Sequence, residues 1–151
     1  MFKRAITDLE IAKQISSLLS QHNNLGTVFT PEMIMAAQGD YIVQTIGPLV
    51  AASLKIERQS YNMTEIKHMV VHPSMRKRGL AKILILSGIK QATTPLIYAT
   101  TRGDNIASCK ALQSCGLKHV GQYTTGNRNV LLYMITGYKY VSPTTNILQG
   151  G

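Results

Sequence analysis

The sequence predicts a single α/β domain in which helices lie on both faces of a mixed, mostly antiparallel sheet. Three observations predict this class. The chain has 151 residues, which is enough for one domain with a substantial core. Its apolar residues recur with helical spacing in four segments and follow a strand-like pattern in the others. The expected order is β, α, α, β, β, β, α, β, α, β, β, a mixture of strands and helices typical of an α/β protein.

Two helices are expected in the first 40 residues. The first lies within residues 6–24 and begins at Thr7, where Glu10 completes a capping box. The second runs from Thr30, a typical helix start, to Gly39, a typical residue just past a helix end.

The segment 41–73 predicts three antiparallel strands, because it is rich in β-branched and aromatic residues. Turn residues at 47–48 and 61–62 separate these strands. A helix is expected at 80–92. Its surface is apolar nearly all round, as in a helix that packs on a sheet and is covered by other elements.

The remaining elements are a strand, a helix and two strands, expected at 95–101, 105–115, 117–125 and 129–135. The domain is expected to span residues 1–140. The polar, glycine-ended segment 141–151 predicts a flexible C-terminal tail.

Charge restricts the partners. There are 16 lysine and arginine residues against 7 acidic ones, a formal net charge of +9. This excess favours acidic partners such as nucleic acid, a phosphorylated ligand or an acidic protein surface, although a solvated basic surface is the alternative. No zinc-type spacing of cysteine and histidine occurs, so no metal is expected.

The expected location is the cytoplasm. The chain has no apolar run near the roughly 20 residues that a membrane span needs, and its first residues lack the apolar centre of a signal peptide. Cys109 and Cys115 lie too far apart on a helix for an unstrained disulfide, so both are expected as reduced thiols.

The stretch "VHPSMRKRGLAKILI" places four basic side chains around one glycine, between a strand and a helix. Where a strand turns into a helix, several backbone N–H groups lack intrahelical partners and converge at the positive end of the helix dipole. Gly79 allows a close backbone approach, and the small Ala81 leaves room for an anion. The loop therefore predicts a phosphate site, although it is neither a GxxxxGK[ST] nor a GxGxxG motif.

The longer stretch "EIKHMVVHPSMRKRGLAKILI" resembles the signature of the GNAT superfamily of N-acetyltransferases, whose acyl-CoA loop reads [QR]xxGx[GA]. Arg76, Gly79 and Ala81 occupy the three defined positions. A second block, "GDNIASCKALQSCGL", is similar to the family's later helix, which begins at an Asn, here Asn105, and ends at a glycine, here Gly116. The resemblance covers roughly residues 1–136 and implies the GNAT fold.

The resemblance implies acetyl-CoA as the cofactor. Its pyrophosphate is expected to bind mostly to main-chain N–H groups of Arg76, Lys77, Arg78, Gly79, Leu80, Ala81 and Lys82. The backbone at Met69 and Val71 is expected to contact the acyl-bearing arm, with the Val71 amide polarising the thioester carbonyl. Asn105 and Ser108 share a helical face that is expected to look toward that arm, although helix capping would also explain both residues.

Amine acetylation requires a proton acceptor, since an ammonium has no lone pair. Glu65 and Lys67 share one face of their strand, and the family often places a glutamate or histidine at such positions. Glu65 is the predicted general base, and a solvated charge at a strand end is the alternative. His68 is expected to pack on the opposite face, and His72 is expected to orient the loop.

A proton donor for the departing thiolate is harder to assign. The family's usual tyrosine position is occupied by Leu112, which cannot donate a proton. Tyr123 is the predicted proton donor. Tyr133, Cys109 or Cys115 could take its place, or the thiolate could leave with help from solvent and helix dipoles alone.

The predicted function is acetyl-CoA-dependent N-acetyltransferase, with direct attack of an amine in a ternary complex. The positive charge favours an acidic or macromolecular acceptor, namely a protein, an aminoacyl-tRNA or a nucleic-acid base, over a polyamine, which a charge of +9 repels. The alternative is a non-catalytic CoA-binding GNAT module that binds nucleic acid or protein. A basic nucleic-acid module of another fold would need stacking aromatics, and only 6% of the chain is aromatic. Whether the chain is a monomer or a homodimer is left open.

Overall fold

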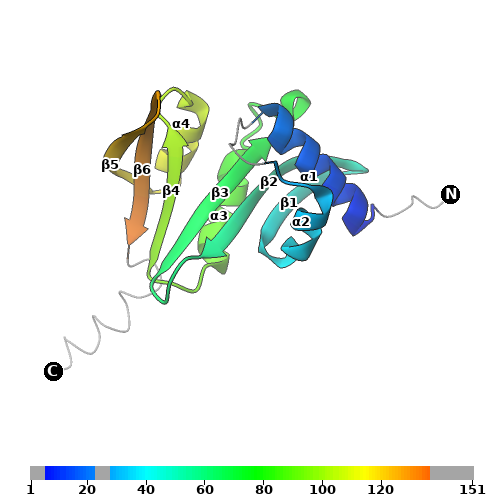
Figure 1. Cartoon of the computed structure of the whole chain (residues 1–151), viewed down its shortest axis with the longest axis horizontal. Helices are drawn as coiled ribbons and strands as arrows, with labels where there is room; N and C mark the ends of the chain where they lie inside the picture. Colours follow the sequence, from blue (N-terminus) through cyan, green and yellow to red (C-terminus); the bar gives the residue numbers. More distant parts are fainter. Residues whose placement is uncertain (1–5, 23–27, 137–151) are drawn as a thin grey trace. The chain divides into compact units, whose positions relative to one another are not determined.

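The structure is a computed structural model that describes residues 6–22 and 28–136, and its elements follow the predicted order (Figure 1). The strand expected ahead of the first helix and the tail at 141–151 lie outside the described residues. The elements are α1 Asp8–His22, α2 Pro31–Ala36, η1 Gln38–Asp40, β1 Tyr41–Ile46, β2 Leu49–Arg58, β3 Met63–Val71, η2 Pro73–Met75, α3 Leu80–Gln91, β4 Leu96–Arg102, α4 Ile106–Ser114, β5 Lys118–Thr125 and β6 Arg128–Thr136.

The strands form a six-stranded sheet in the order β1-β2-β3-β4-β6-β5. The pairs β1–β2, β4–β6 and β5–β6 are antiparallel, whereas β3 and β4 are parallel. A mixed, mostly antiparallel sheet with flanking helices confirms the predicted fold class. The helices of the described ranges are all too short or too polar to cross a bilayer.

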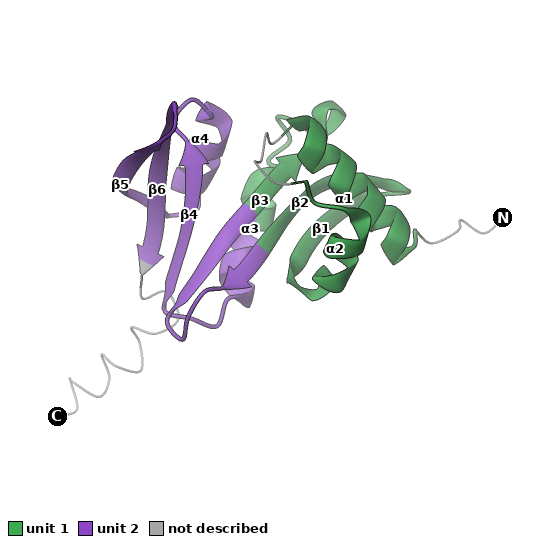
Figure 2. Cartoon of the chain, viewed as in Figure 1, with its two compact units in different colours: residues 1–55, 68–84 green, residues 56–67, 85–151 purple. Residues whose placement is uncertain are grey.

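The chain divides into two compact units that interrupt each other in sequence (Figure 2). Unit 1 contains residues 1–55 and 68–84, and unit 2 contains residues 56–67 and 85–151. The division falls inside β2, β3 and α3, so each unit is described by itself.

Unit 1 is built on the apolar face of α1. This helix and α2 pack on β2 and the end of β3 through a core of Ala12, Ile15, Leu18, Leu19, Ile34, Val50 and Val70. The capping box is present: the Thr7 amide donates to Glu10 Oε2 at 2.8 Å, and the Glu10 amide donates to Thr7 Oγ1 at 3.2 Å. Gln14 ties the helix to β2, because its Oε1 accepts from the Val50 amide at 2.7 Å.

In unit 2, α4 covers β4 and β5 and buries Cys109 and Leu112. The parallel β3–β4 pairing runs from Met63 opposite Leu96 to Ile66 opposite Ala99. Its inner face includes the buried side chains Thr64, Ile66, Ile97 and Ala99, and Tyr133 of β6 lies opposite Ala99.

The helix α3 differs from its prediction. Its apolar surface predicts a helix that is covered all round, and Leu84, Ile85 and Ile89 are indeed buried. Ile83 and Leu86, however, are 52% and 45% exposed. The expectation of complete cover is therefore wrong, because no described element packs over that side of the helix.

Candidate active site

The basic loop, residues 76–82, lies in unit 1 and connects η2 to α3. Lys77 and Gly79 both have left-handed backbone conformations, with φ of 65° and 76°. A Cβ added at Gly79 would meet no protein atom within 4 Å, so the packing of the protein does not require the glycine there, whereas its left-handed conformation favours it. The side chains of Arg76, Lys77, Arg78 and Lys82 are exposed.

The start of α3 supplies the loop's hydrogen-bond donors. The first helical hydrogen bond runs from the Ile83 N–H to the Gly79 carbonyl, at 3.2 Å. The preceding amides of Leu80 and Ala81 therefore have no intrahelical acceptor and lie at the positive end of the helix dipole. Backbone donors beside exposed cations suit a diphosphate group, so these residues fit the pyrophosphate of acetyl-CoA.

His72 orders the beginning of this connection. Its Nδ1 accepts a hydrogen bond from the Ser74 amide at 3.1 Å and lies 2.8 Å from the Ser74 hydroxyl. Its own amide donates to the Ala51 carbonyl of β2 at 2.8 Å. Met69 and Val71, the predicted contacts of the acyl-bearing arm, are half-buried in the strand that precedes it.

His68 interrupts the regular alternation of β3. Its φ of 53° is left-handed, which is rare for a residue other than glycine inside a strand. Its ring packs on Phe29, with 4.4 Å between the ring centroids. The prediction that His68 faces away from Glu65 assumes that side chains alternate regularly along the strand. This alternation does not hold strictly at His68.

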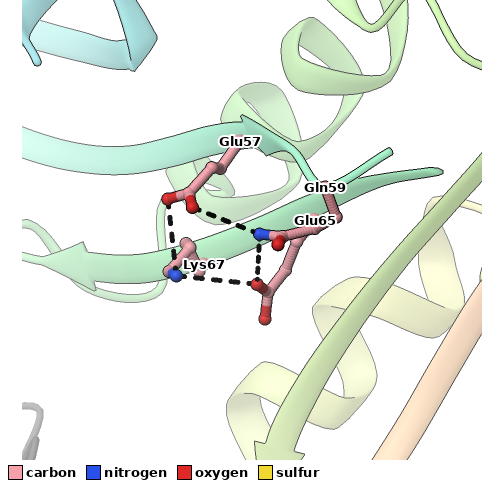
Figure 3. A network of polar contacts seen from close by, with 4 residues as sticks. All are labelled: Glu57, Gln59, Glu65 and Lys67. Carbon is pink, nitrogen blue, oxygen red and sulfur yellow. Dashed lines mark hydrogen bonds and ion pairs between the residues drawn. The ribbon is translucent and has the colours of Figure 1, made fainter. Parts of the chain in front are cut away.

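The carboxylate cluster consists of Glu57, Gln59, Glu65 and Lys67 and lies in unit 2 (Figure 3). Glu57 belongs to β2, Glu65 and Lys67 belong to β3, and Gln59 directly follows the end of β2. The Lys67 Nζ lies 3.5 Å from Glu57 Oε2 and 3.6 Å from Glu65 Oε1. The Gln59 Nε2 donates to Glu57 Oε1 at 3.3 Å and to Glu65 Oε1 at 3.1 Å. Lys67 and Gln59 thus each bridge the two carboxylates.

Tyr98 of β4 adds a hydroxyl next to this cluster, because the parallel register places it opposite Glu65. Burial, and then the charges of Glu65 and Glu57 and the neighbouring Tyr123, raise the pKa of Tyr98 above its ordinary 10.0. Tyr98 therefore keeps its proton at neutral pH, and its hydroxyl is able to donate a hydrogen bond.

Tyr123, the predicted proton donor, lies on the same face of the sheet as Tyr98. Tyr123 of β5 pairs with Val130 of β6, and Val130 pairs with Arg102 of β4. Because alternate residues of β4 share a face, Tyr98 and Arg102 point to the same side as Tyr123. The structure therefore brings Glu65, Tyr98 and Tyr123 to one face of unit 2, with Tyr123 51% exposed.

The alternative proton donors lie elsewhere. Tyr133 is buried, and its hydrogen bond with Cys109, followed by burial, raises its pKa above 10.0. Tyr133 is opposite Ala99, so it faces the other side of the sheet from Tyr98. Cys109 and Cys115 are buried and form no disulfide, and Leu112 is buried in the core.

Asn105 caps α4. Its Oδ1 accepts a hydrogen bond from the Ser108 amide at 3.2 Å. This capping accounts for the asparagine at that position, and contact of Asn105 and Ser108 with acetyl-CoA stays a prediction. Within residues 6–22 and 28–136, no group of three or more His, Cys, Asp or Glu side chains could hold a metal ion.

Sequence reasoning missed Glu57, Gln59 and Tyr98. A signal for Glu57 and Gln59 was present in the sequence. In a hairpin whose turn is centred near Tyr61, residue 57 lies opposite residue 65 and residue 59 lies opposite residue 63. Tyr98 had no such signal, because the register of β3 against β4 depends on a crossover connection of many residues.

Comparison with known proteins identifies the class of protein. Residues 30–117, more than half of the chain, match the family model described as the acetyltransferase (GNAT) family. The chain belongs to this family. It is therefore an acetyl-CoA-dependent N-acetyltransferase, and family membership favours an enzyme over a non-catalytic module.

Solved structures share its fold. An acetyltransferase of the GNAT family from Bacillus cereus superposes with a TM-score of 0.71 at 15% identity, covering 90% of this chain and 96% of the other. The yncA structure from Salmonella typhimurium, with its cofactor acetyl-CoA, has a TM-score of 0.72 at 14% identity and coverages of 90% and 92%. A spermidine N-acetyltransferase from Vibrio cholerae, in complex with CoA and spermine, has a TM-score of 0.65 at 15% identity and coverages of 92% and 96%. No curated protein sequence matches the chain.

Proposed function

We propose that the chain acetylates an amine by direct attack in a ternary complex, with Glu65 as the proton acceptor. The observation that carries this proposal is the position of the Glu65 carboxylate. Its Oε1 contacts Gln59 and Lys67, whereas its Oε2 makes no hydrogen bond or ion pair with any described residue. Figure 3 shows the second oxygen pointing away from both partners, so it is available to an incoming ammonium group.

The residues divide the work between cofactor and proton transfer. Bound acetyl-CoA supplies the acetyl thioester. The basic loop would hold its pyrophosphate, and Met69, Val71, Asn105 and Ser108 are the remaining proposed contacts. Glu65 accepts the proton that frees the lone pair of the acceptor amine. Tyr123, which is exposed on the face that Glu65 shares, is the proposed donor of the proton that the leaving thiolate takes up.

The proposed acceptor is an amine of an acidic macromolecule. Near Glu65 the cluster carries two carboxylates and one ammonium, a local excess of negative charge that favours a protonated amine. The whole chain carries +9, which favours an acidic surrounding. A lysine in an acidic protein segment or the amino group of an aminoacyl-tRNA satisfies both conditions. A nucleic-acid base satisfies only the second, because its amino groups are neutral.

A small cationic amine is the second candidate. The local carboxylates favour it, and one of the structures of similar fold is a spermidine N-acetyltransferase. The positive charge of the whole chain opposes it by repelling cations at long range.

Release of CoA thiol should be measured with three acceptors: a lysine peptide with acidic flanks, the same peptide with basic flanks, and spermidine. The proposal expects the highest kcat/KM for the acidic peptide, and an advantage that shrinks as salt rises from about 0.05 M to about 0.5 M. A higher kcat/KM for spermidine at every salt concentration would establish the second candidate instead. Neither Cys109 nor Cys115 is in a disulfide, which suits a reducing compartment, so we also propose a cytoplasmic location.

A further inference from the structure

The carboxylate cluster is a closed ring of four contacts, all within unit 2. Lys67 joins the two carboxylates on one side at 3.5 and 3.6 Å, and Gln59 joins them on the other at 3.3 and 3.1 Å. Both contacts to Glu65 go to the same oxygen, Oε1. Glu57 contacts both bridging residues, Lys67 and Gln59.

We propose that Glu57, Gln59 and Lys67 are positioning residues that hold Oε1 of Glu65 and thereby direct Oε2 toward the acceptor amine. This inference rests on the proposed function, in which Glu65 takes the amine's proton. The three residues touch neither the proton nor the acetyl group. Glu57 anchors Gln59 and Lys67, and these two fix the rotation of the Glu65 carboxylate.

The test is turnover, measured with the acidic lysine peptide and with spermidine. Lys13→Met, at an exposed lysine of α1, is the control and should change nothing. Lys67→Met should lower kcat roughly tenfold, which is the smaller end of the loss of activity expected when a residue that orients a functional side chain is removed. Its affinity for acetyl-CoA should stay unchanged, and Lys67→Arg should restore most of kcat. An unchanged kcat in Lys67→Met, alongside an inactive Glu65→Gln, would overturn the positioning role and leave the proposed function intact. Full activity of Glu65→Gln would instead overturn the proposed proton acceptor, and the positioning role with it.

Discussion

The basic loop and the carboxylate cluster are built in different ways. The loop is a continuous run of seven residues, 76–82, whose proposed donors are main-chain amides at the start of a helix. The cluster draws three side chains from two strands and a fourth, Gln59, from the connection between them, and the tyrosine beside it comes from a third strand. A phosphate site made by the backbone can be read from a short motif, whereas a site made by side chains needs the strand register.

The two regions also differ in what they can tolerate. At the loop, most side chains are exposed, and the restrictions are a left-handed backbone at Gly79 and a small residue at position 81. At the cluster, each side chain contacts at least two others, so the identity of each one matters. Changes at the loop should therefore affect cofactor binding, and changes at the cluster should affect turnover.

The largest effect is expected at the cluster. Glu65→Gln keeps the size and most of the packing of the side chain but cannot accept a proton. We expect kcat/KM to fall by roughly 10² to 10⁴, the usual contribution of general base catalysis. The measurement is acceptor-dependent release of CoA thiol, with Glu32→Gln, at an exposed acid of α2, as the matched control. A loss of less than twofold would remove Glu65 from the chemistry.

The next largest effect is expected at the loop. Ala81→Tyr places a bulky ring at the start of α3, beside the amides proposed to bind pyrophosphate. We expect acetyl-CoA to bind roughly 100-fold more weakly, a loss of about 2.8 kcal/mol. Calorimetric titration measures this loss, and Ala36→Tyr at the exposed end of α2 controls for the added ring. Equal affinities of the two variants would contradict the assignment of the loop.

A smaller effect, on stability, tests whether Gly79 is needed for its left-handed backbone conformation or for the space around it. Gly79→Ala meets no atom within 4 Å but forces alanine into a φ of 76°. We expect the free energy of unfolding to drop by about 1 kcal/mol from this strain alone. Gly39→Ala is the matched control, since its added Cβ also meets nothing and its φ is not left-handed. Urea unfolding of both variants provides the test, and an equal change in the two would argue against strain at Gly79.

The smallest effect concerns the tyrosine beside the cluster. Burial and the neighbouring carboxylates raise the pKa of Tyr98 above 10.0, so above that pH the folded protein keeps a proton that the unfolded chain has lost. Stability is unaffected below pH 10 and falls as pH rises toward the folded value. In Tyr98→Phe this fall should be smaller. Urea unfolding at about pH 8 and about pH 11 measures it, and Tyr61→Phe, at a tyrosine that is 83% exposed, is the control. An identical fall in both variants would contradict the electrostatic account of Tyr98.

Much of the fold follows from local patterns in the sequence. The capping box at Thr7 and Glu10, the turn at 47–48 and the apolar run at 80–92 each specify their element without reference to the rest of the chain. What local patterns could not specify is the left-handed conformation of His68, which occurs in a strand without glycine. They also could not show that Ile83 and Leu86 stay exposed, because cover depends on where other elements pack.

The candidate site divides in the same way. Glu65 and Lys67 were predicted to share a face, since residues two apart in a strand do so. Tyr98 joins them only through the parallel pairing of β3 with β4, and its partner Tyr123 only through the pairings of β6 with both β4 and β5. Such contacts between distant segments are a property of the folded sheet.

The most direct test is a calorimetric titration of acetyl-CoA into Glu65→Gln, alongside the wild type. The account places cofactor binding in the basic loop and proton transfer in the carboxylate cluster. It therefore predicts equal dissociation constants for the two proteins, while only the wild type turns over. Much weaker binding of acetyl-CoA to Glu65→Gln would contradict this division, because it would make Glu65 part of the cofactor site.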